Sequence, residues 1–250
     1  MGKVYLVGAG PGAPDLLTLR AARILASADI VLHDALVHPD TLKLATKARF
    51  IDVGKRYGKV STEQRFIHRA LIEAARTHEV VVRLKGGDPM MFGRAQEELE
   101  ALADAGIETE VVPGVTAALA AASALKVSLT RRGIARTVSF LTPRVGKGET
   151  ASEWLAAALA SDTVILYMAA GAGPEIARAL IGARKPPSTP VALVESATLE
   201  SERRTFTTLG LLAQSEATKA EGPVLVCVGE VFRDAAQDLQ IEPLRINEHR

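Results

Sequence analysis

The chain has 250 residues, 48% of them hydrophobic, which is enough to bury a substantial core in one large domain or two smaller ones. Thirty lysine and arginine residues stand against 29 aspartate and glutamate residues, so the net charge is +1 and no basic block indicates a nucleic-acid groove. Aromatic residues make up only 4% of the chain, which also argues against base stacking.

Three further features indicate the cellular compartment in which the protein works. The single cysteine, Cys227, lies in an apolar run typical of a buried strand, so we expect a small core residue rather than a nucleophile or a disulfide partner. The apolar run at residues 4–7 is too short for a signal peptide and leads directly into a glycine loop. The apolar stretch at 111–129 is interrupted by proline, glycine, hydroxyl and lysine residues, unlike a membrane span. We therefore expect a cytoplasmic protein that uses no membrane.

Short β-rich runs alternate with helical patterns along the chain, which is typical of an α/β sheet. In the first half, the patterns predict strands over residues 3–8, 29–33, 49–53, 80–84 and 108–112. Helices are predicted near 15–26, 61–77, 94–105 and 114–125. The second of these helices begins with Ser61 and Gln64 at the spacing of a capping box.

A second series follows, with strands predicted near 137–141, 163–167, 191–195, 203–207 and 224–229 and helices near 152–160 and 174–181. The last strands follow one another with no helical pattern between them, which indicates antiparallel pairing and a mixed sheet. We therefore expect an α/β protein of two lobes with a cleft between them. The N-terminal lobe, 1–125, is expected to hold a mainly parallel sheet, and the C-terminal lobe, 126–250, a mixed one. The polar tail after Phe232 is expected to fray.

The first predicted strand ends in a glycine-rich loop at residues 8–12, a context that suits the dinucleotide fingerprint Gly-x-Gly-x-x-Gly. Pro11 and Pro14 lack the amide hydrogens that a pyrophosphate cradle needs. Asp34 follows the second strand but within His-Asp-Ala-Leu, which makes it a poor ribose partner. The loop alone therefore predicts an NAD site only weakly.

The fourth predicted strand is a β-branched run that stops at Gly86, Gly87, Asp88 and Pro89. Ligands in open α/β sheets bind just beyond the carboxyl ends of strands, and the two glycines let a ligand approach the backbone closely. The alternative is a tight turn in which Asp88 hydrogen-bonds its own backbone. This segment taken alone leaves both interpretations open.

Several motifs occur in order: Val-Tyr-Leu-Val-Gly-Ala-Gly-Pro-Gly at 4–12, Val-Val-Arg-Leu-Lys-Gly-Gly-Asp-Pro at 81–89, Val-Pro-Gly-Val-Thr-Ala at 112–117 and Pro-Val-Ala-Leu-Val-Glu at 190–195. With these motifs, roughly residues 3–233 resemble the tetrapyrrole methylase family, most closely its members that methylate uroporphyrinogen III. The resemblance implies S-adenosylmethionine as methyl donor, no metal, two α/β lobes flanking an active cleft, and a homodimer.

The resemblance also assigns a set of residues to the cofactor. These are Pro11, Gly86, Gly87, Asp88, Met91, Thr116, Ala117, Met168 and Ala197. S-adenosylmethionine carries no phosphate, so its site tolerates prolines where a nucleotide cradle does not. Asp88 would contact a polar end of the cofactor, and the two methionines would form adaptable apolar walls, although for either methionine taken singly core packing is the more common role.

By family position, Asp34 is the candidate proton acceptor and Lys55 the candidate proton donor. The alternatives are that Asp34 caps a loop and that Lys55 is an exposed charge at a strand end. A polycarboxylate substrate needs a locally basic cleft. Any single arginine is more often a solvated surface charge, so the prediction rests on the clustering of basic residues after strand ends. Besides Lys55, the candidates for that cleft are Arg56, Arg94, Arg131, Arg132 and Arg144.

The sequence departs from the family pattern at Ala13, Ala35, Arg144 and Ala169, around the expected acceptor pocket. The expected reaction is C-methylation of uroporphyrinogen III to precorrin-2 through precorrin-1, in the branch that leads to sirohaem and cobalamin. The alternatives are a family member that acts on a later precorrin, an NAD-linked oxidoreductase, and an inactive tetrapyrrole-binding module.

Overall fold

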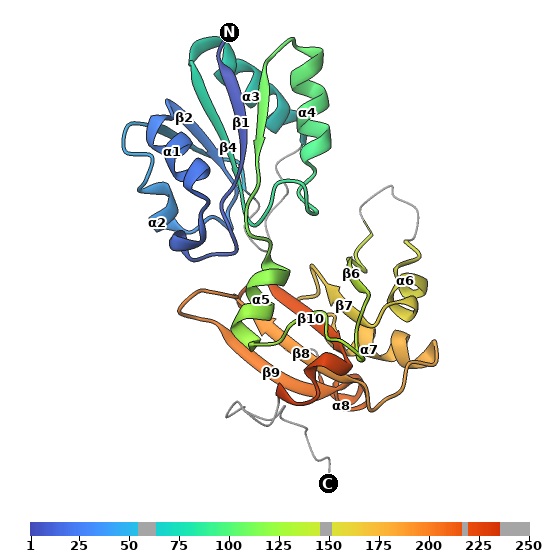
Figure 1. Cartoon of the computed structure of the whole chain (residues 1–250). Coiled ribbons are helices and arrows are strands. Elements are labelled where there is room, and N and C mark those ends of the chain that lie inside the picture. Colours follow the sequence, from blue (N-terminus) through green and yellow to red (C-terminus); the bar gives the residue numbers. More distant parts are fainter. Residues whose placement is uncertain (55–63, 146–151, 217–219, 236–250) are drawn as a thin grey trace. The chain divides into compact units, whose positions relative to one another are not determined.

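The computed structural model describes residues 1–54, 64–145, 152–216 and 220–235. The chain divides into two compact units, Met1–Ala117 and Ala118–Arg250, which we call unit 1 and unit 2 (Figure 1). The division falls at the start of helix α5 (Ala117–Leu125), whereas the expected lobe boundary between residues 125 and 126 follows that helix. The expected boundary stays a prediction.

Unit 1 contains a parallel sheet of five strands in the order β3-β2-β4-β1-β5. The strands are β1 (Lys3–Gly8), β2 (Ile30–His33), β3 (Arg49–Asp52), β4 (Val80–Lys85) and β5 (Thr109–Val112). The helices are α1 (Leu19–Ser27), α2 (Pro39–Leu42), α3 (Gln64–Thr77) and α4 (Ala95–Asp104), with a short 3-10 turn, η1 (Pro14–Leu16). The predicted parallel sheet is confirmed.

Helices cover both faces of this sheet, with α1 and α2 on one side and α3 and α4 on the other (Figure 1). Alternate residues of β4 therefore enter two different cores. Val81 packs with Leu71 of α3, whereas Val82 and Leu84 pack with Leu25 of α1. Burial on both faces explains why β4 begins with three consecutive valines, Val80–Val82, instead of an alternating pattern.

Unit 2 contains a mixed sheet of five strands in the order β6-β7-β10-β8-β9, in which β6 and β7 are parallel and the other neighbours antiparallel. The strands are β6 (Val138–Leu141), β7 (Thr163–Leu166), β8 (Pro190–Glu195), β9 (Arg203–Thr208) and β10 (Val224–Gly229). Besides α5, the helices are α6 (Trp154–Ala160), α7 (Gly173–Gly182) and α8 (Leu209–Gln214), followed by the 3-10 turn η2 (Glu230–Phe232). The predicted mixed sheet is confirmed.

One expectation about unit 2 is wrong, because α8 separates β9 from β10 where no helix was predicted. The helix is only six residues long, and the Thr208 hydroxyl caps it by accepting the N–H of Leu211 at 3.3 Å. Leu209 and Leu212 bury its inner side in the core of unit 2. A segment this short gives too little periodicity to be recognised as a helix.

Several predicted element ends shift by a few residues. Helix α1 begins at Leu19 because Thr18 caps it, accepting the N–H of Ala21 at 3.1 Å. Within the described residues α3 begins at Gln64, so the predicted capping box at 61–64 lies mostly outside them, as does most of the tail. Burial raises the pKa of the Cys227 thiol to about 12, in keeping with a small core residue. In the described part of the chain, no helix has both the length and the apolarity to cross a membrane.

Candidate active site

Three loops meet at one edge of the unit 1 sheet, where the neighbouring parallel strands β4, β1 and β5 have their carboxyl ends. The loop after β1 pairs with the loop after β4 through two backbone hydrogen bonds. The Gly87 N–H donates to the Gly10 carbonyl at 2.6 Å, and the Gly10 N–H donates to the Gly87 carbonyl at 3.2 Å. This edge is the position at which open α/β sheets bind their ligands.

Glycines are required here because the backbones approach too closely for side chains. A Cβ on Gly8 would lie 2.6 Å from the Gly114 Cα atom, and one on Gly114 would lie 2.3 Å from the Gly87 carbonyl oxygen. Gly87 also has a positive φ of 67°, which side chains disfavour. The edge of the sheet consequently presents main-chain atoms with little side-chain cover.

Asp88 fastens two of these loops together. Its Oδ1 accepts the N–H of Met90 at 2.8 Å, and its Oδ2 accepts the N–H of Gly114 in the loop after β5 at 2.9 Å. The alternative in which Asp88 bonds its own backbone is therefore confirmed. Each carboxylate oxygen retains a second lone pair, so contact with a ligand stays a prediction.

The predicted cofactor residues of unit 1 lie along this edge. Pro11 follows Gly10 in the paired loop, and a Cβ built on Gly87 would contact the Thr116 Cα atom at 3.9 Å. The Met91 N–H donates to the Asp88 carbonyl at 3.2 Å, which places Met91 beside Gly86 and Gly87. Ala117 follows Thr116 and begins α5.

The two remaining predicted cofactor residues belong to unit 2. Met168 follows β7 and Ala197 follows β8, and these strands run in the same direction on either side of β10, so both residues lie at one edge of that sheet. Met168 is 45% exposed and has a positive φ angle of 55°. Ser196 and Thr198, which flank Ala197, also have positive φ angles, of 52° and 71°. Non-glycine residues adopt this conformation rarely, and often at functional sites.

Asp34 lies at the carboxyl end of β2, and its Oδ1 accepts a hydrogen bond of 2.6 Å from Nη2 of Arg83 on the neighbouring strand β4. Arg83 also donates from Nε to Glu98 of α4 at 3.1 Å, and Nζ of Lys85 lies 3.0 Å from both Glu98 oxygens. We call Asp34, Arg83, Lys85 and Glu98 the buried ionic cluster. Burial and the Arg83 charge lower the pKa of Lys85, against the opposing effect of Glu98.

The sequence analysis did not identify Arg83, Lys85 or Glu98 as functional residues. Their side chains are only 3%, 4% and 0% exposed, an unusual environment for charged groups. The available signal was two cations spaced two residues apart in an otherwise apolar strand, which places both on the same face of the sheet. Their acidic partner comes 13 to 15 residues later, on a different element, and the sequence pattern gives no pairing.

A family model described as Tetrapyrrole (Corrin/Porphyrin) Methylases matches residues 3–213. The chain belongs to this family. Among curated proteins, the uroporphyrinogen-III C-methyltransferase of Pseudomonas aeruginosa is 45% identical over 234 residues, which cover 93% of this chain and 95% of that protein. The siroheme synthase of Chromobacterium violaceum is 43% identical over 232 residues, which cover 92% of this chain but 49% of that longer protein.

Solved structures of the family share the fold. Uroporphyrin-III C-methyl transferase from Thermus thermophilus, in its native form and complexed with S-adenyl homocysteine, superposes with a TM-score of 0.82 at 40% identity. Each match covers 93% of this chain and 99% of the Thermus chain. A cobalt precorrin-4 methyltransferase gives a TM-score of 0.77 at 28% identity, so the two-lobed α/β architecture extends across the family.

The remaining residues predicted from the family are scattered. Lys55 and Arg56 lie outside the described residues. Arg94 adopts a positive φ of 55° just before α4 and forms two hydrogen bonds of 2.6 Å with Glu97, whose pKa the Arg94 guanidinium lowers. Arg144 is exposed after β6, and its N–H donates to the Thr142 hydroxyl. Their roles toward an acceptor stay predictions.

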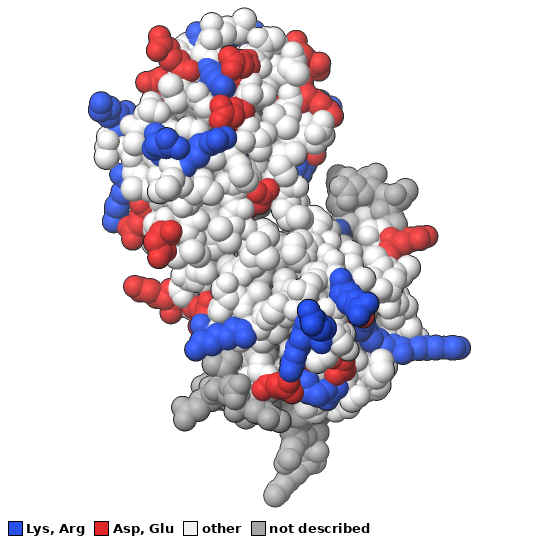
Figure 2. Space-filling view, in the orientation of Figure 1, with Lys and Arg blue, Asp and Glu red and all other residues white. Residues whose placement is uncertain are grey.

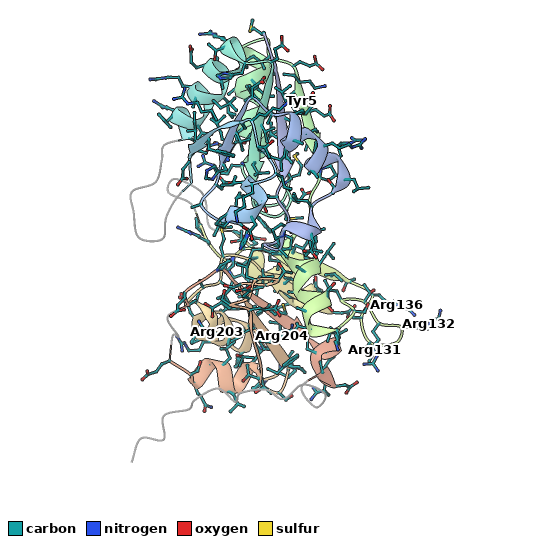
Figure 3. The ribbon with its side chains drawn as sticks, turned by 90° about the vertical axis from the view of Figure 1, so that its left-hand side faces the viewer. Tyr5, Arg131, Arg132, Arg136, Arg203 and Arg204 are labelled. Carbon is teal, nitrogen blue, oxygen red and sulfur yellow. The ribbon has the colours of Figure 1, made fainter. Side chains whose placement is uncertain are left out.

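Arg131 and Arg132 lie at the other edge of the unit 2 sheet from Met168. The Thr163 hydroxyl, at the first residue of β7, donates to the Leu129 carbonyl at 2.9 Å, whereas Met168 follows the last residue of that strand. Arg131 is ion-paired with Asp234 at 2.9 Å. Figure 3 shows Arg131, Arg132 and Arg136 near one another at one side of unit 2. Within this unit, Arg131 and Arg132 are therefore separated from Met168 by the length of β7.

Charge is distributed differently over the visible faces of the two units. Acidic and basic side chains are interspersed over unit 1, whereas several basic side chains lie close together on unit 2 (Figure 2). Among the described residues, no group of three or more histidine, cysteine, aspartate or glutamate side chains is arranged to hold a metal ion.

Proposed function

We propose that this chain catalyses the S-adenosylmethionine-dependent C-methylation of uroporphyrinogen III to precorrin-2, through precorrin-1. The observation that carries the proposal is the similarity to the Pseudomonas enzyme of that name along 93% of this chain and 95% of the relative. A match of that extent is stronger support than the glycine loops, which alone leave the ligand open. The Thermus relative, solved with S-adenyl homocysteine, supports the choice of donor.

The backbone of unit 1 fits a sulfonium donor better than a nucleotide phosphate. The edge formed by the loops after β1, β4 and β5 lacks side chains at Gly8, Gly87 and Gly114, and Pro11 offers no amide hydrogen to a phosphate. The residues proposed to hold the cofactor are Pro11, Gly86, Gly87, Asp88, Met91, Thr116 and Ala117 from this edge, with Met168 and Ala197 from unit 2.

When bound, S-adenosylmethionine supplies a methyl group carried on a positively charged sulfur. A ring carbon of the acceptor forms the new carbon–carbon bond while the carbon–sulfur bond breaks and leaves its electron pair on sulfur. The ring then carries a positive charge until it loses a proton. In our proposal the Asp34 carboxylate accepts this proton. The step takes up no proton, so Lys55, the candidate proton donor by family position, has no part in it. Holding donor and acceptor in line contributes on the order of 7–11 kcal/mol to such a step.

The acceptor is a polycarboxylate, which calls for arginines that can pair with carboxylates. The proposed set is Arg56, Arg94, Arg131, Arg132 and Arg144. Within unit 2, Arg131 and Arg132 lie at the other edge of the sheet from Met168. From the resemblance to the family, we also propose that the enzyme is a homodimer. We further propose that the enzyme works in the cytoplasm, where its product enters the sirohaem and cobalamin branch.

The deciding experiment is a product assay. The purified protein is incubated anaerobically with uroporphyrinogen III and S-adenosylmethionine, the mixture is oxidised, and the product is examined by absorbance and mass. Two added methyl groups are expected. S-adenosylmethionine binding with no methylated product would contradict the acceptor and favour a later precorrin or an inactive binding module. NAD binding without S-adenosylmethionine binding would favour an oxidoreductase.

A further inference from the structure

The buried ionic cluster contains an arginine whose geometry is fixed on three sides. Arg83 donates from Nε to Glu98 at 3.1 Å, from Nη1 to the Leu84 carbonyl at 3.2 Å and from Nη2 to Asp34 at 2.6 Å. The guanidinium group is planar and rigid, so these three bonds determine its orientation. With a side chain only 3% exposed, it has little room for another conformation.

Glu98 supplies the anchor for this arginine. The carboxylate is fully buried in the first turn of α4, where the helix dipole favours a negative charge. Besides Arg83, it accepts hydrogen bonds from Nζ of Lys85 at 3.0 Å and from Nε2 of Gln64 on α3 at 3.4 Å. Glu98, on α4, is thus bonded to α3 and to β4, and these contacts fix the carboxylate that orients the guanidinium.

Asp34 lies where the cluster reaches the surface. Its side chain is 29% exposed, in contrast to the other three members. Its backbone is held as well, because the Asp34 N–H donates to the Leu84 carbonyl and the Asp34 carbonyl accepts from Val37, both at 3.2 Å. These backbone bonds fix the main chain of Asp34, and the bond from Arg83 to Oδ1 orients its side chain. The carboxylate nevertheless remains accessible.

We infer that Arg83 is a positioning residue for methyl transfer: it holds the Asp34 carboxylate in the orientation from which Asp34 accepts the proton lost by the methylated ring. The inference rests on the proposed function. A guanidinium group stays protonated in proteins, so Arg83 does not exchange the proton itself. Its contribution is the position and the charge environment of the carboxylate.

A double-mutant cycle tests the inference. Arg83→Lys keeps the positive charge, but a single ammonium group does not reproduce the fork that reaches Glu98, Leu84 and Asp34 together. We expect R83K to lower kcat by about 10- to 100-fold, the range that misplacement of a reacting group produces, with KM for S-adenosylmethionine unchanged within about twofold. In a protein that already carries Asp34→Asn, R83K should change kcat by less than about twofold, because the two residues act through one step.

Equal losses from R83K in both backgrounds would overturn the inference, as would wild-type kcat in R83K. Arg233→Lys is the matched control, because Arg233 pairs with Glu230 on the surface of unit 2 and should tolerate the change. If R83K does not fold, Glu98→Gln replaces it, because it weakens the hydrogen bond that holds Arg83 on the side away from Asp34. This variant should lower kcat by the same factor, and the effect should again disappear in a protein that carries Asp34→Asn.

A structural measurement separates this inference from the proposed function. In a crystal structure of R83K, the Asp34 side chain should leave its wild-type position, and this outcome does not depend on the acceptor being identified correctly. A wild-type protein that does not methylate uroporphyrinogen III would contradict the proposed function, and an unmoved Asp34 side chain would contradict the positioning role.

Discussion

At the scale of single residues, the most unusual environment is that of the Glu98 carboxylate. It is fully buried, yet it receives hydrogen bonds from Arg83, Lys85 and Gln64. Taking charges out of water is costly, and their mutual attraction offsets the cost only while every partner is present. The buried ionic cluster is consequently a place where the removal of one group should affect the whole of unit 1.

We expect Glu98→Ala to destabilise the protein by about 3–5 kcal/mol, because it leaves the buried Lys85 without its counter-charge and removes one of the two carboxylates paired with Arg83. The measurement is the free energy of unfolding from urea titration. Glu97→Ala is the control, since Glu97 forms an exposed pair with Arg94 and should cost about 1 kcal/mol or less. Similar losses for both variants would show that Glu98 contributes no more than a surface charge.

At the scale of elements, the glycine loops after β1, β4 and β5 pack too closely to admit added side chains. We expect Gly114→Ala to destabilise the fold by about 1–3 kcal/mol and to weaken binding of S-adenosylhomocysteine, because the new Cβ would lie 2.3 Å from the Gly87 carbonyl oxygen. Urea titration and calorimetric binding measure the two effects. Gly182→Ala is the control, because a Cβ there meets nothing within 4 Å. Unchanged affinity in Gly114→Ala would contradict a cofactor at this edge.

A second prediction at this scale concerns Glu195 at the end of β8. Burial raises its pKa, but hydrogen bonds from Arg203 and from the backbone N–H groups of Gly222 and Glu221 outweigh that and hold the pKa below its usual value of 4.5. Because the unfolded chain binds this proton at a higher pH, the stabilisation is complete above pH 4.5 and is lost as the pH falls through the lowered pKa.

The free energy of unfolding of the wild-type protein should therefore exceed that of Glu195→Gln by roughly 1.5–3 kcal/mol at pH 7. This gap between the two proteins should narrow below pH 4.5. Unfolding free energies measured across this range give the gap directly. Glu200→Gln, an exposed change in the following turn, should stay within about 0.5 kcal/mol of the wild type at each pH. A gap for Glu195→Gln that is independent of pH would contradict the assignment.

How far the sequence predicts each element depends on what its residues contact. The strands of both sheets were predicted because burial on the sheet faces requires β-branched apolar runs, as in β4 and β10. The short α8 was not predicted, because six residues show no periodicity. Arg83 was not identified because its partners Asp34 and Glu98 come from a different strand and a helix. The glycine loops were identified from local sequence, yet their mutual contacts required the structure.

At the scale of the whole molecule, the predicted cofactor residues are divided between two units that each have their own sheet and core. Met168 of unit 2 is one of the residues proposed to hold the cofactor, so its removal should affect binding without affecting folding. Met168 is 45% exposed, so its side chain contributes little to the core of its own unit.

We expect Met168→Ala to weaken S-adenosylhomocysteine binding by about tenfold, the effect of losing roughly 1.4 kcal/mol of apolar contact. Calorimetry measures the dissociation constant, and urea titration should show an unfolding free energy within about 0.5 kcal/mol of the wild type. Leu211→Ala removes a similarly exposed apolar side chain from unit 2 and should leave binding unchanged. Unchanged affinity in Met168→Ala would restrict the cofactor site to unit 1.

The glycine edge of unit 1 has a consequence for how such an enzyme changes over evolution. Where these loops meet, the main-chain hydrogen bonds between Gly10 and Gly87 and the close approaches of Gly8 and Gly114 leave no side chain for mutation to alter. Variation is then tolerated mainly in the surrounding residues, such as Ala13 and Ala35, which do not form this contact. If the donor binds at this backbone edge, as we propose, the edge can stay constant while neighbouring residues diverge, and one scaffold can serve a series of related ring substrates.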